Sequence, residues 1–162
     1  MCNTRAKIVC MTWLKDLYVL RQYTDSLYHS SGVLARQTEK LAKEIWAPSG
    51  LPPSHGHLLL AVLYTEFRYP TIFSKNLSLN LSTINRSLAK LEKDGYVMRH
   101  YYGHYTLVSA TQKAWELMPV LEGCQKAFAD RCNELLGEEE TSRLAASMCK
   151  AADKLTVGEG RA

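Results

Sequence analysis

The sequence predicts a mainly α-helical protein with one small β-hairpin, which places it in the α+β class. Three observations support this prediction. Apolar residues recur three and four positions apart through residues 13–46 and again from Gln112 onwards, as they do in amphipathic helices. Strand-forming residues are concentrated in one stretch, residues 96–109. Turn-forming residues at 48–53 and at Gly137 separate these segments.

The first helical stretch, residues 13–46, is one long helix or two, because Ser and Gly at 30–32 interrupt its apolar pattern. It ends at the Pro- and Gly-rich residues 48–53, which cannot continue a helix. Ser54 is the predicted N-cap of the next helix. That helix includes residues 57–64, which are apolar on all sides, so we expect it to be buried.

Residues 71–95 predict two short helices joined by a tight turn. The first, residues 71–79, has room for about two turns. Ser82 is the predicted N-cap of the second helix. This helix runs to about Asp94, where Gly95 can adopt the left-handed conformation that ends it. Its narrow apolar face consists of Ile84, Leu88 and Leu91.

A short hairpin follows the second helix. Residues 96–100 and 105–109 are rich in strand formers, and a four-residue turn, 101–104, joins them. Two helices, a tight turn and a hairpin in this order predict a winged helix-turn-helix. In that motif the second helix enters the major groove of DNA and the hairpin is the wing.

The residues expected to contact DNA form two groups. Five polar residues of the second helix are predicted to face the major groove: Ser82, Thr83, Asn85, Arg86 and Ser87. Among them, Arg86 suits guanine and Asn85 suits adenine, because each pairs with two atoms of that base. Phosphates are predicted to be held by Lys75, Asn76, Lys90 and Arg99, with His104 of the hairpin turn as a further candidate.

The distribution of charge agrees with a DNA-binding middle segment. The net charge is +4 overall, but residues 68–113 carry seven Lys or Arg against two Asp or Glu, a net +5. Residues 1–67 carry +2 and residues 114–162 carry −3. Cations at a DNA interface release the counterions that surround phosphates, which favours binding. The alternative is a solvated charged face, which is common in proteins.

Long helices at both ends of the chain predict a dimer. Thr111 is the expected N-cap of a helix over residues 112–136, which contains Pro119. Gly137 separates this helix from a final helix whose first residues are rich in Glu. The apolar stripes of such helices need a partner, and a two-fold dimer supplies one. The predicted divisions are an extension at 1–24, dimerisation helices at 25–50 and 111–155, a winged-helix lobe at 51–110, and a tail at 156–162.

Several classes of function are not expected. No apolar run approaches the length of a membrane span, and residues 8–14 lack a cleavage site, so we expect a cytoplasmic protein without a membrane partner. The sequence has no set of nucleophile and base and no phosphate-binding loop, so we do not expect an enzyme. The five cysteines lack the paired spacing of zinc sites, so we expect reduced thiols and no metal or other cofactor.

These residues resemble the MarR family of bacterial and archaeal transcription regulators. The resemblance covers about residues 25–155. The residues that show the resemblance are 50–54, the recognition-helix segment 81–97, residues 107–114 after the wing, and residues 137–140. It implies a winged-helix homodimer, usually a repressor, that binds a palindromic operator and releases it on meeting a small ligand, an oxidant or a metal.

The chain departs from the family pattern in two places. Family wings usually carry an Asp-x-Arg element whose Arg enters the minor groove, but the turn here is Tyr-Tyr-Gly-His at 101–104. Arg99, His100 and His104 are then the candidates for phosphate contact by this wing. The second departure is the additional N-terminal segment, which either adds a helix to the dimer interface or covers a pocket.

More than one kind of effector, the signal that would release the protein from DNA, is a candidate. The resemblance implies a small aromatic or phenolic acid, for which Arg36 and His57 are candidate carboxylate partners. The alternative is that Arg36 is solvated and His57 is a residue at a helix end. Cys2 and Cys10, in a basic tail, are candidates for redox sensing. Two further hypotheses are a cysteine-based regulator of the same fold and a winged-helix protein-interaction module that has lost DNA binding.

Overall fold

The computed structural model describes residues 21–65 and 68–156 and divides the chain into two compact units, residues 1–41 and 42–162. In the first unit, residues 21–24 are helical and a break at residues 25–26 separates them from helix α2 (Leu27–Trp46). The Oγ of Ser26 accepts a hydrogen bond from the His29 backbone N–H at 3.2 Å, as an N-cap does. The stretch 21–46 is therefore two helical segments.

The second unit begins with the end of α2 and leads into a buried helix. A 3-10 turn, η1 (Ala47–Ser49), ends at Gly50, whose φ of +67° favours glycine. Helix α3 (Pro53–Tyr64) follows, and most of its residues are buried, as its composition predicts. The predicted N-cap is wrong, because Pro52 occupies that position and Ser54 lies within the first turn. Pro53 is suited to the first helical position, so the helix begins there.

The predicted helix-turn-helix is present in the structure. Helix α4 (Pro70–Asn76) is followed by a turn and by helix α5 (Leu81–Lys93). Gly95, just beyond α5, has a φ of +80°, which confirms its predicted role in ending the helix. The N-cap of α5 is Asn80 rather than Ser82, because the backbone is extended at Asn80 and enters the helix at the next residue.

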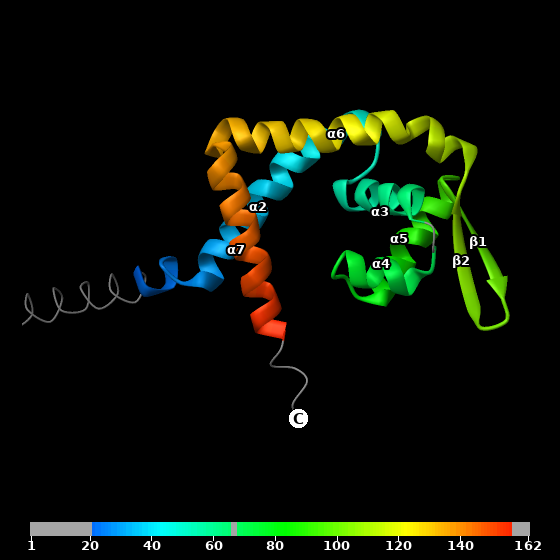
Figure 1. Cartoon of the computed structure of the whole chain (residues 1–162), viewed down its shortest axis with the longest axis horizontal. Helices are drawn as coiled ribbons and strands as arrows, with labels where there is room; N and C mark the ends of the chain where they lie inside the picture. The colour runs from blue at the N-terminus through cyan, green and yellow to red at the C-terminus, as the bar shows by residue number, and fades with distance from the viewer. Residues whose placement is uncertain (1–20, 66–67, 157–162) are drawn as a thin grey trace, which may run out of the picture. The chain divides into compact units, whose positions relative to one another are not determined.

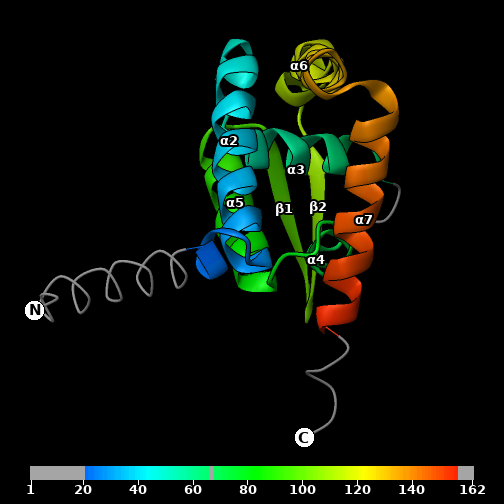
Figure 2. The same cartoon turned by 90° about the vertical axis from the view of Figure 1, so that its left-hand side faces the viewer.

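The hairpin consists of β1 (Val97–Tyr102) and β2 (Tyr105–Ala110), which pair antiparallel and lie side by side (Figure 2). Tyr102 pairs with Tyr105, so the turn contains two residues and the predicted four-residue turn is wrong. Gly103, the first turn residue, has a φ of +58°, which glycine adopts without strain. Tyr101 and Tyr102, which were assigned to the turn, are strand formers and extend β1 by two residues.

Two long helices complete the second unit. Helix α6 (Gln112–Leu136) begins at the end of the hairpin and runs away from it (Figure 1). Thr111 is its N-cap, as predicted, and accepts a hydrogen bond from the Ala114 N–H at 3.4 Å. Helix α7 (Glu138–Thr156) follows Gly137 and has no buried residue. Its apolar side chains therefore pack against little in the described part of the chain.

One hydrophobic core holds the lobe together. It joins the end of α2 to α3, α4, α5, the hairpin and the first half of α6. The fully buried large side chains are Trp46, Leu58, Leu59, Val62, Phe73, Ile84, Leu88, Leu91, Val97, Val108 and Leu121. Each such side chain contributes roughly 1.5–3 kcal/mol by leaving water. Within the described residues, no helix is both long enough and apolar enough to cross a membrane.

Candidate nucleic-acid interface

Helix α5 has one buried face and one exposed polar face. Ile84, Leu88 and Leu91 are at most 1% exposed, which confirms the predicted apolar face. Of the five residues predicted to face a major groove, Ser82, Asn85 and Arg86 are exposed, and Thr83 and Ser87 are half-buried. The apolar face therefore fixes α5 on the lobe and leaves side chains that donate and accept hydrogen bonds at the surface.

Arg86 is held only weakly on this face. Its Nε lies 3.4 Å from the Ser82 carbonyl oxygen, and its Nη2 lies 3.5 Å from Oγ1 of Thr83. Both distances exceed those of strong hydrogen bonds. The guanidinium can therefore exchange these contacts for a base edge at little cost.

The turn between α4 and α5 is fixed by local hydrogen bonds. Oγ of Ser74 donates to the Leu79 carbonyl at 2.6 Å, and the Leu79 N–H donates to the Ser74 carbonyl at 3.0 Å. Ser78, between them, has a φ of +51°. It is the one non-glycine residue with positive φ in the described chain. Lys75 and Asn76, predicted phosphate contacts, are exposed at the start of this turn.

Lys90 lies on the exposed side of α5 and pairs with Asp94. Its Nζ is 3.0 Å from the Asp94 Oδ1, and the lysine side chain is 59% exposed. Exposed pairs of this kind contribute little stability. Lys90 is therefore available to exchange this carboxylate for a phosphate, and its predicted role stays a prediction.

Arg99, another predicted phosphate contact, is tied to α5 by Glu92. Its Nε and Nη2 donate to Oε2 of Glu92 at 2.8 Å and 2.5 Å, and its backbone N–H donates to Oε1 at 3.1 Å. The hydrogen bonds from Arg99 lower the pKa of Glu92, although burial opposes this. The same pair raises the pKa of Arg99. The sequence analysis missed this bond between helix and strand.

A second set of contacts joins the end of α5 to the start of α6. The hydroxyl of Thr111 donates to the Gly95 carbonyl at 2.8 Å. The Nζ of Lys113 donates to the Asp94 carbonyl at 2.7 Å and lies 4.3 Å from the centre of the Tyr96 ring. A cation at the C-terminus of a helix is favourable, because the last carbonyls carry partial negative charge. These contacts fix α5 to the helix that follows the wing.

The end of the hairpin is exposed and aromatic. His104 lies in the turn and is exposed, as its predicted phosphate role requires. Tyr101, Tyr102 and Tyr105 are 68%, 66% and 70% exposed. The base of the hairpin is held by the core and by a hydrogen bond from the Val108 N–H to the Arg68 carbonyl at 2.8 Å.

The two candidate effector residues lie in different units. Arg36 is an exposed residue of α2 in the first unit. His57 is in α3 of the second unit, where its Nδ1 lies 2.8 Å from the Pro53 carbonyl and its ring centre 4.5 Å from that of Trp46. These contacts agree with His57 as a residue at a helix end.

The cysteines have three different environments. Cys124 is buried in the core, Cys132 is half-buried and Cys149 is exposed, so of these three only Cys124 is a core residue. Cys2 and Cys10, the redox candidates, lie outside the described residues. Among residues 21–65 and 68–156, no three His, Cys, Asp or Glu side chains are grouped so that they could hold a metal ion.

The fold is shared with solved structures. No family model matches the sequence, and no curated protein matches it. The transcriptional repressor CouR bound to a 23-mer DNA duplex is 18% identical with a TM-score of 0.72, covering 81% of this chain and 95% of its own. The MepR–DNA complex from S. aureus is 15% identical with a TM-score of 0.71, covering 80% and 98%. A MarR transcriptional regulator from Methanosarcina mazei Go1 is 17% identical with a TM-score of 0.64, covering 81% and 90%.

These comparisons confirm the predicted fold class and, at the level of the fold, the resemblance to the MarR family. The chain has a MarR-like winged-helix fold. Two of these neighbours, CouR and the Methanosarcina mazei Go1 protein, are transcriptional regulators. CouR from Rhodococcus jostii RHA1 is also matched in a structure bound to p-coumaroyl-CoA, at 17% identity and a TM-score of 0.67, covering 80% of this chain and 93% of its own.

Proposed function

We propose that this chain, with its MarR-like winged-helix fold, is a DNA-binding transcriptional repressor of the bacterial or archaeal cytoplasm. The observation that carries the proposal is the exposed face of α5, where Ser82, Asn85 and Arg86 project opposite a fully buried apolar face. This face has the hydrogen-bonding groups that read base edges. Solved structures of CouR and MepR with the same fold are bound to DNA.

The proposed contacts divide into base reading and phosphate binding. Arg86 donates to the O6 and N7 atoms of guanine, and Asn85 exchanges two hydrogen bonds with adenine. Lys75 and Asn76 at the end of α4 and Lys90 on α5 hold phosphates, and these contacts set the position of α5 in the groove. Arg99 fixes the wing through Glu92, and its direct phosphate contact remains a prediction.

We propose that the active form is a homodimer that binds a palindromic operator. Helix α7 and the end of α6 expose apolar side chains, with Leu136 at 49%, Met148 at 43% and Leu155 at 70%. A second copy would cover them by two-fold symmetry, since the same surface then pairs with itself. Two recognition helices would then be about one DNA turn apart.

A small aromatic or phenolic acid is proposed as the effector. The support is by analogy with CouR, which has been solved with p-coumaroyl-CoA. Arg36 and His57 remain separate candidates for a carboxylate partner, one in each unit. The ligand shifts the protein off DNA only to the extent that it binds the DNA-free form more tightly.

Selection of genomic DNA fragments with the purified full-length chain tests this function. We expect recovery of fragments that contain an inverted repeat, and a mobility shift that weakens steeply as salt rises from about 50 to 200 mM. The absence of salt-sensitive binding to any fragment would overturn the proposal and favour the winged-helix interaction module. The genes beside a recovered fragment would indicate the chemical class of effector to test.

A further inference from the structure

The end of α5 is joined to the first turn of α6 by one lysine side chain. The Nζ of Lys113 donates to the Asp94 carbonyl at 2.7 Å and lies 4.3 Å from the centre of the Tyr96 ring. The stem of the lysine passes Gly95, where an added Cβ would lie 4.0 Å from Cδ of Lys113. The side chain therefore crosses the whole turn between α5 and β1.

This turn suits a cation because the last carbonyls of a helix have no partner within it and carry partial negative charge. The face of the Tyr96 ring attracts a cation as well. The hydroxyl of Thr111 donates to the Gly95 carbonyl at 2.8 Å, next to the carbonyl that Lys113 satisfies. Two consecutive carbonyls at the end of α5 are therefore capped by side chains from the start of α6.

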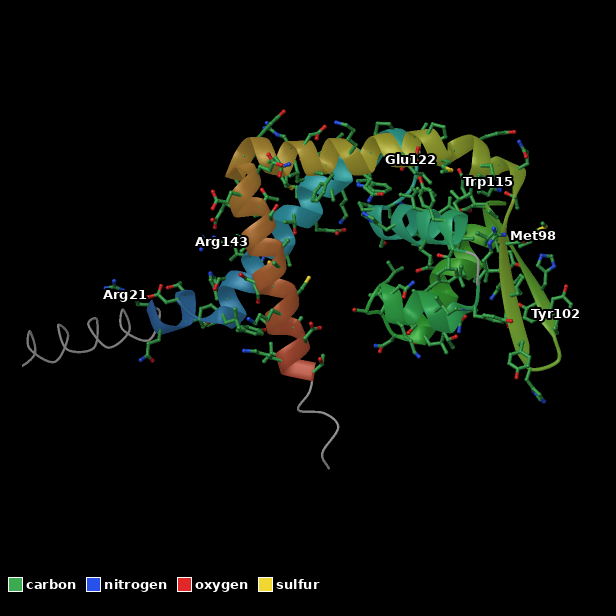
Figure 3. The ribbon with its side chains drawn as sticks, viewed as in Figure 1. Arg21, Met98, Tyr102, Trp115, Glu122 and Arg143 are labelled. Atoms are coloured by element: carbon green, nitrogen blue, oxygen red, sulfur yellow. The ribbon has the colours of Figure 1, made fainter. Side chains whose placement is uncertain are left out.

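A second contact holds α6 to α3, further along the helix. The hydroxyl of Tyr64, at the end of α3, donates to the carboxylate of Glu122. Figure 3 shows Trp115 at the hairpin end of α6 and Glu122 about two turns further along. Lys113 acts at the first turn of α6 and Tyr64 nearer its middle. Together these contacts set the angle between α6 and the winged-helix lobe.

The length of α6 converts a small change of this angle into a large displacement. Its 25 residues extend about 37 Å. A tilt of about 5° at its start would move its far end by about 3 Å, close to the rise between neighbouring base pairs. In the proposed dimer, the far end of α6 meets the second copy. The angle at Lys113 would then set the distance between the two recognition helices.

We infer that Lys113 is a positioning residue, which fixes α5 on α6 and thereby sets the spacing of operator half-sites that the dimer accepts. This inference rests on the proposed function. Lys113 acts through the end of α5 and not by touching DNA. A direct phosphate contact by Lys113 is the alternative. The salt dependence of binding separates the two, because a phosphate contact releases counterions from DNA and a contact within the protein releases none.

The test compares the full-length chain with Lys113→Met, which keeps a long side chain and removes its charge. Both are titrated with duplexes of about 30 base pairs that contain the inverted repeat recovered by selection. The repeat has its original spacing or a single base pair inserted or removed between the half-sites. We expect Lys113→Met to bind the original duplex about fivefold more weakly. It should lose less affinity than the wild type when the spacing changes, with an unchanged slope of log K against log salt.

Two further variants are the controls. Lys113→Arg should restore the narrow preference for one spacing, because a guanidinium also donates to a carbonyl and packs on a tyrosine ring. Lys126→Met removes the charge of another lysine of α6, which is 77% exposed and pairs with Asp130. It should leave both the affinity and the preferred spacing unchanged.

The spacing preference is a sharp readout, because a variant that only destabilises the fold loses affinity equally for every duplex. A preference in Lys113→Met that is as narrow as in the wild type therefore overturns the inference. A salt slope reduced by about one with an unchanged preference also overturns it and indicates a phosphate contact. Failure of the wild-type chain to bind any selected duplex would instead contradict the proposed function.

Hydrogen exchange of the free proteins gives a readout that needs no operator. Loss of a cap frays the end of a helix, and frayed amides exchange faster. We expect the amides of residues 90–96 to exchange faster in Lys113→Met than in the wild type or in Lys126→Met. Equal exchange in all three proteins would show that Lys113 does not hold the end of α5, and would overturn the inference while leaving the regulator function intact.

Discussion

Glu92 in α5 accepts three hydrogen bonds from Arg99 in β1, two from the guanidinium and one from the backbone. The two residues are seven positions apart, on either side of the turn that ends α5. The pair therefore joins the recognition helix to the wing by a contact with fixed geometry, since a planar guanidinium on a carboxylate fixes orientation as well as distance. The wing is positioned by α5, the element beside which it would act.

The first prediction concerns this pair and pH. Glu92→Gln should lower the free energy of unfolding by about 1 kcal/mol at pH 7, because the pair is partly exposed. The pKa of Glu92 is lower in the folded protein, so the charged pair stabilises the fold above the ordinary carboxyl value of about 4.3. That stability is lost as pH falls below this value toward the lowered pKa. Urea unfolding at pH 7 and at about pH 3 should show the difference between wild type and variant shrinking.

The control for this prediction is Glu44→Gln, which neutralises an exposed carboxylate of α2. It should change stability little at either pH, as surface substitutions usually do. A gap between wild type and Glu92→Gln that stays constant with pH would show that the ion pair does not contribute through its charge.

The second prediction concerns the turn between α4 and α5. Ser78→Gly should raise the free energy of unfolding by about 0.5 kcal/mol, since glycine adopts a φ of +51° without the cost that a side chain brings. Ser78→Val should lower it by roughly 1–2 kcal/mol, because a branched side chain is least suited to this conformation. Chemical denaturation of both variants checks the order. Equal stabilities would contradict the left-handed backbone at Ser78.

The third prediction compares two helical glycines. A Cβ on Gly56 would overlap the buried Trp46 ring, with Cε3 only 2.6 Å away, whereas a Cβ on Gly123 meets nothing within 4 Å. Gly56→Ala should therefore lower the free energy of unfolding by about 2–3 kcal/mol, although alanine favours helices. Gly123→Ala should raise it by about 0.5–1 kcal/mol. Thermal unfolding of the two variants should shift in opposite directions, and shifts of the same sign would be inconsistent with this packing.

The fourth prediction concerns base reading by Arg86. Arg86→Ala should cost about 1–3 kcal/mol of affinity for the selected operator and relax specificity at the contacted position. Lys75→Ala should weaken binding to operator and mixed-sequence DNA alike, because phosphates carry no sequence information. Fluorescence anisotropy with the two duplexes measures both effects. An equal loss on both for Arg86→Ala would remove the base-reading role.

The sequence predicted elements best where a single residue type decides the backbone. Gly95 ends α5, Thr111 begins α6 and Gly137 ends it, at the positions expected from their conformational preferences. The caps at Ser54 and Ser82 were wrong, because an N-cap hydrogen bond contributes only about 1 kcal/mol. Pro53 at a helix start and the extended backbone at Asn80 outweigh it.

Which residues of the candidate interface are exposed was predicted in part. The exposed face of α5 follows from its apolar spacing, so Asn85 and Arg86 were placed correctly on the surface. The Glu92–Arg99 pair could not be read from the sequence, because it depends on how a strand folds back against a helix. The length of the hairpin turn also depended on pairing, since Tyr101 and Tyr102 suit a strand as well as a turn.

The lack of any buried residue on α7 has a consequence for how the protein melts. A helix in water is marginal unless an apolar face is packed, and most helical stability in proteins comes from such packing. If a second copy supplies that packing, folding of α7 and association are one equilibrium, and the temperature at which α7 unfolds rises with protein concentration. Dilution alone would then unwind α7 while the winged-helix lobe, with its own core, stays folded.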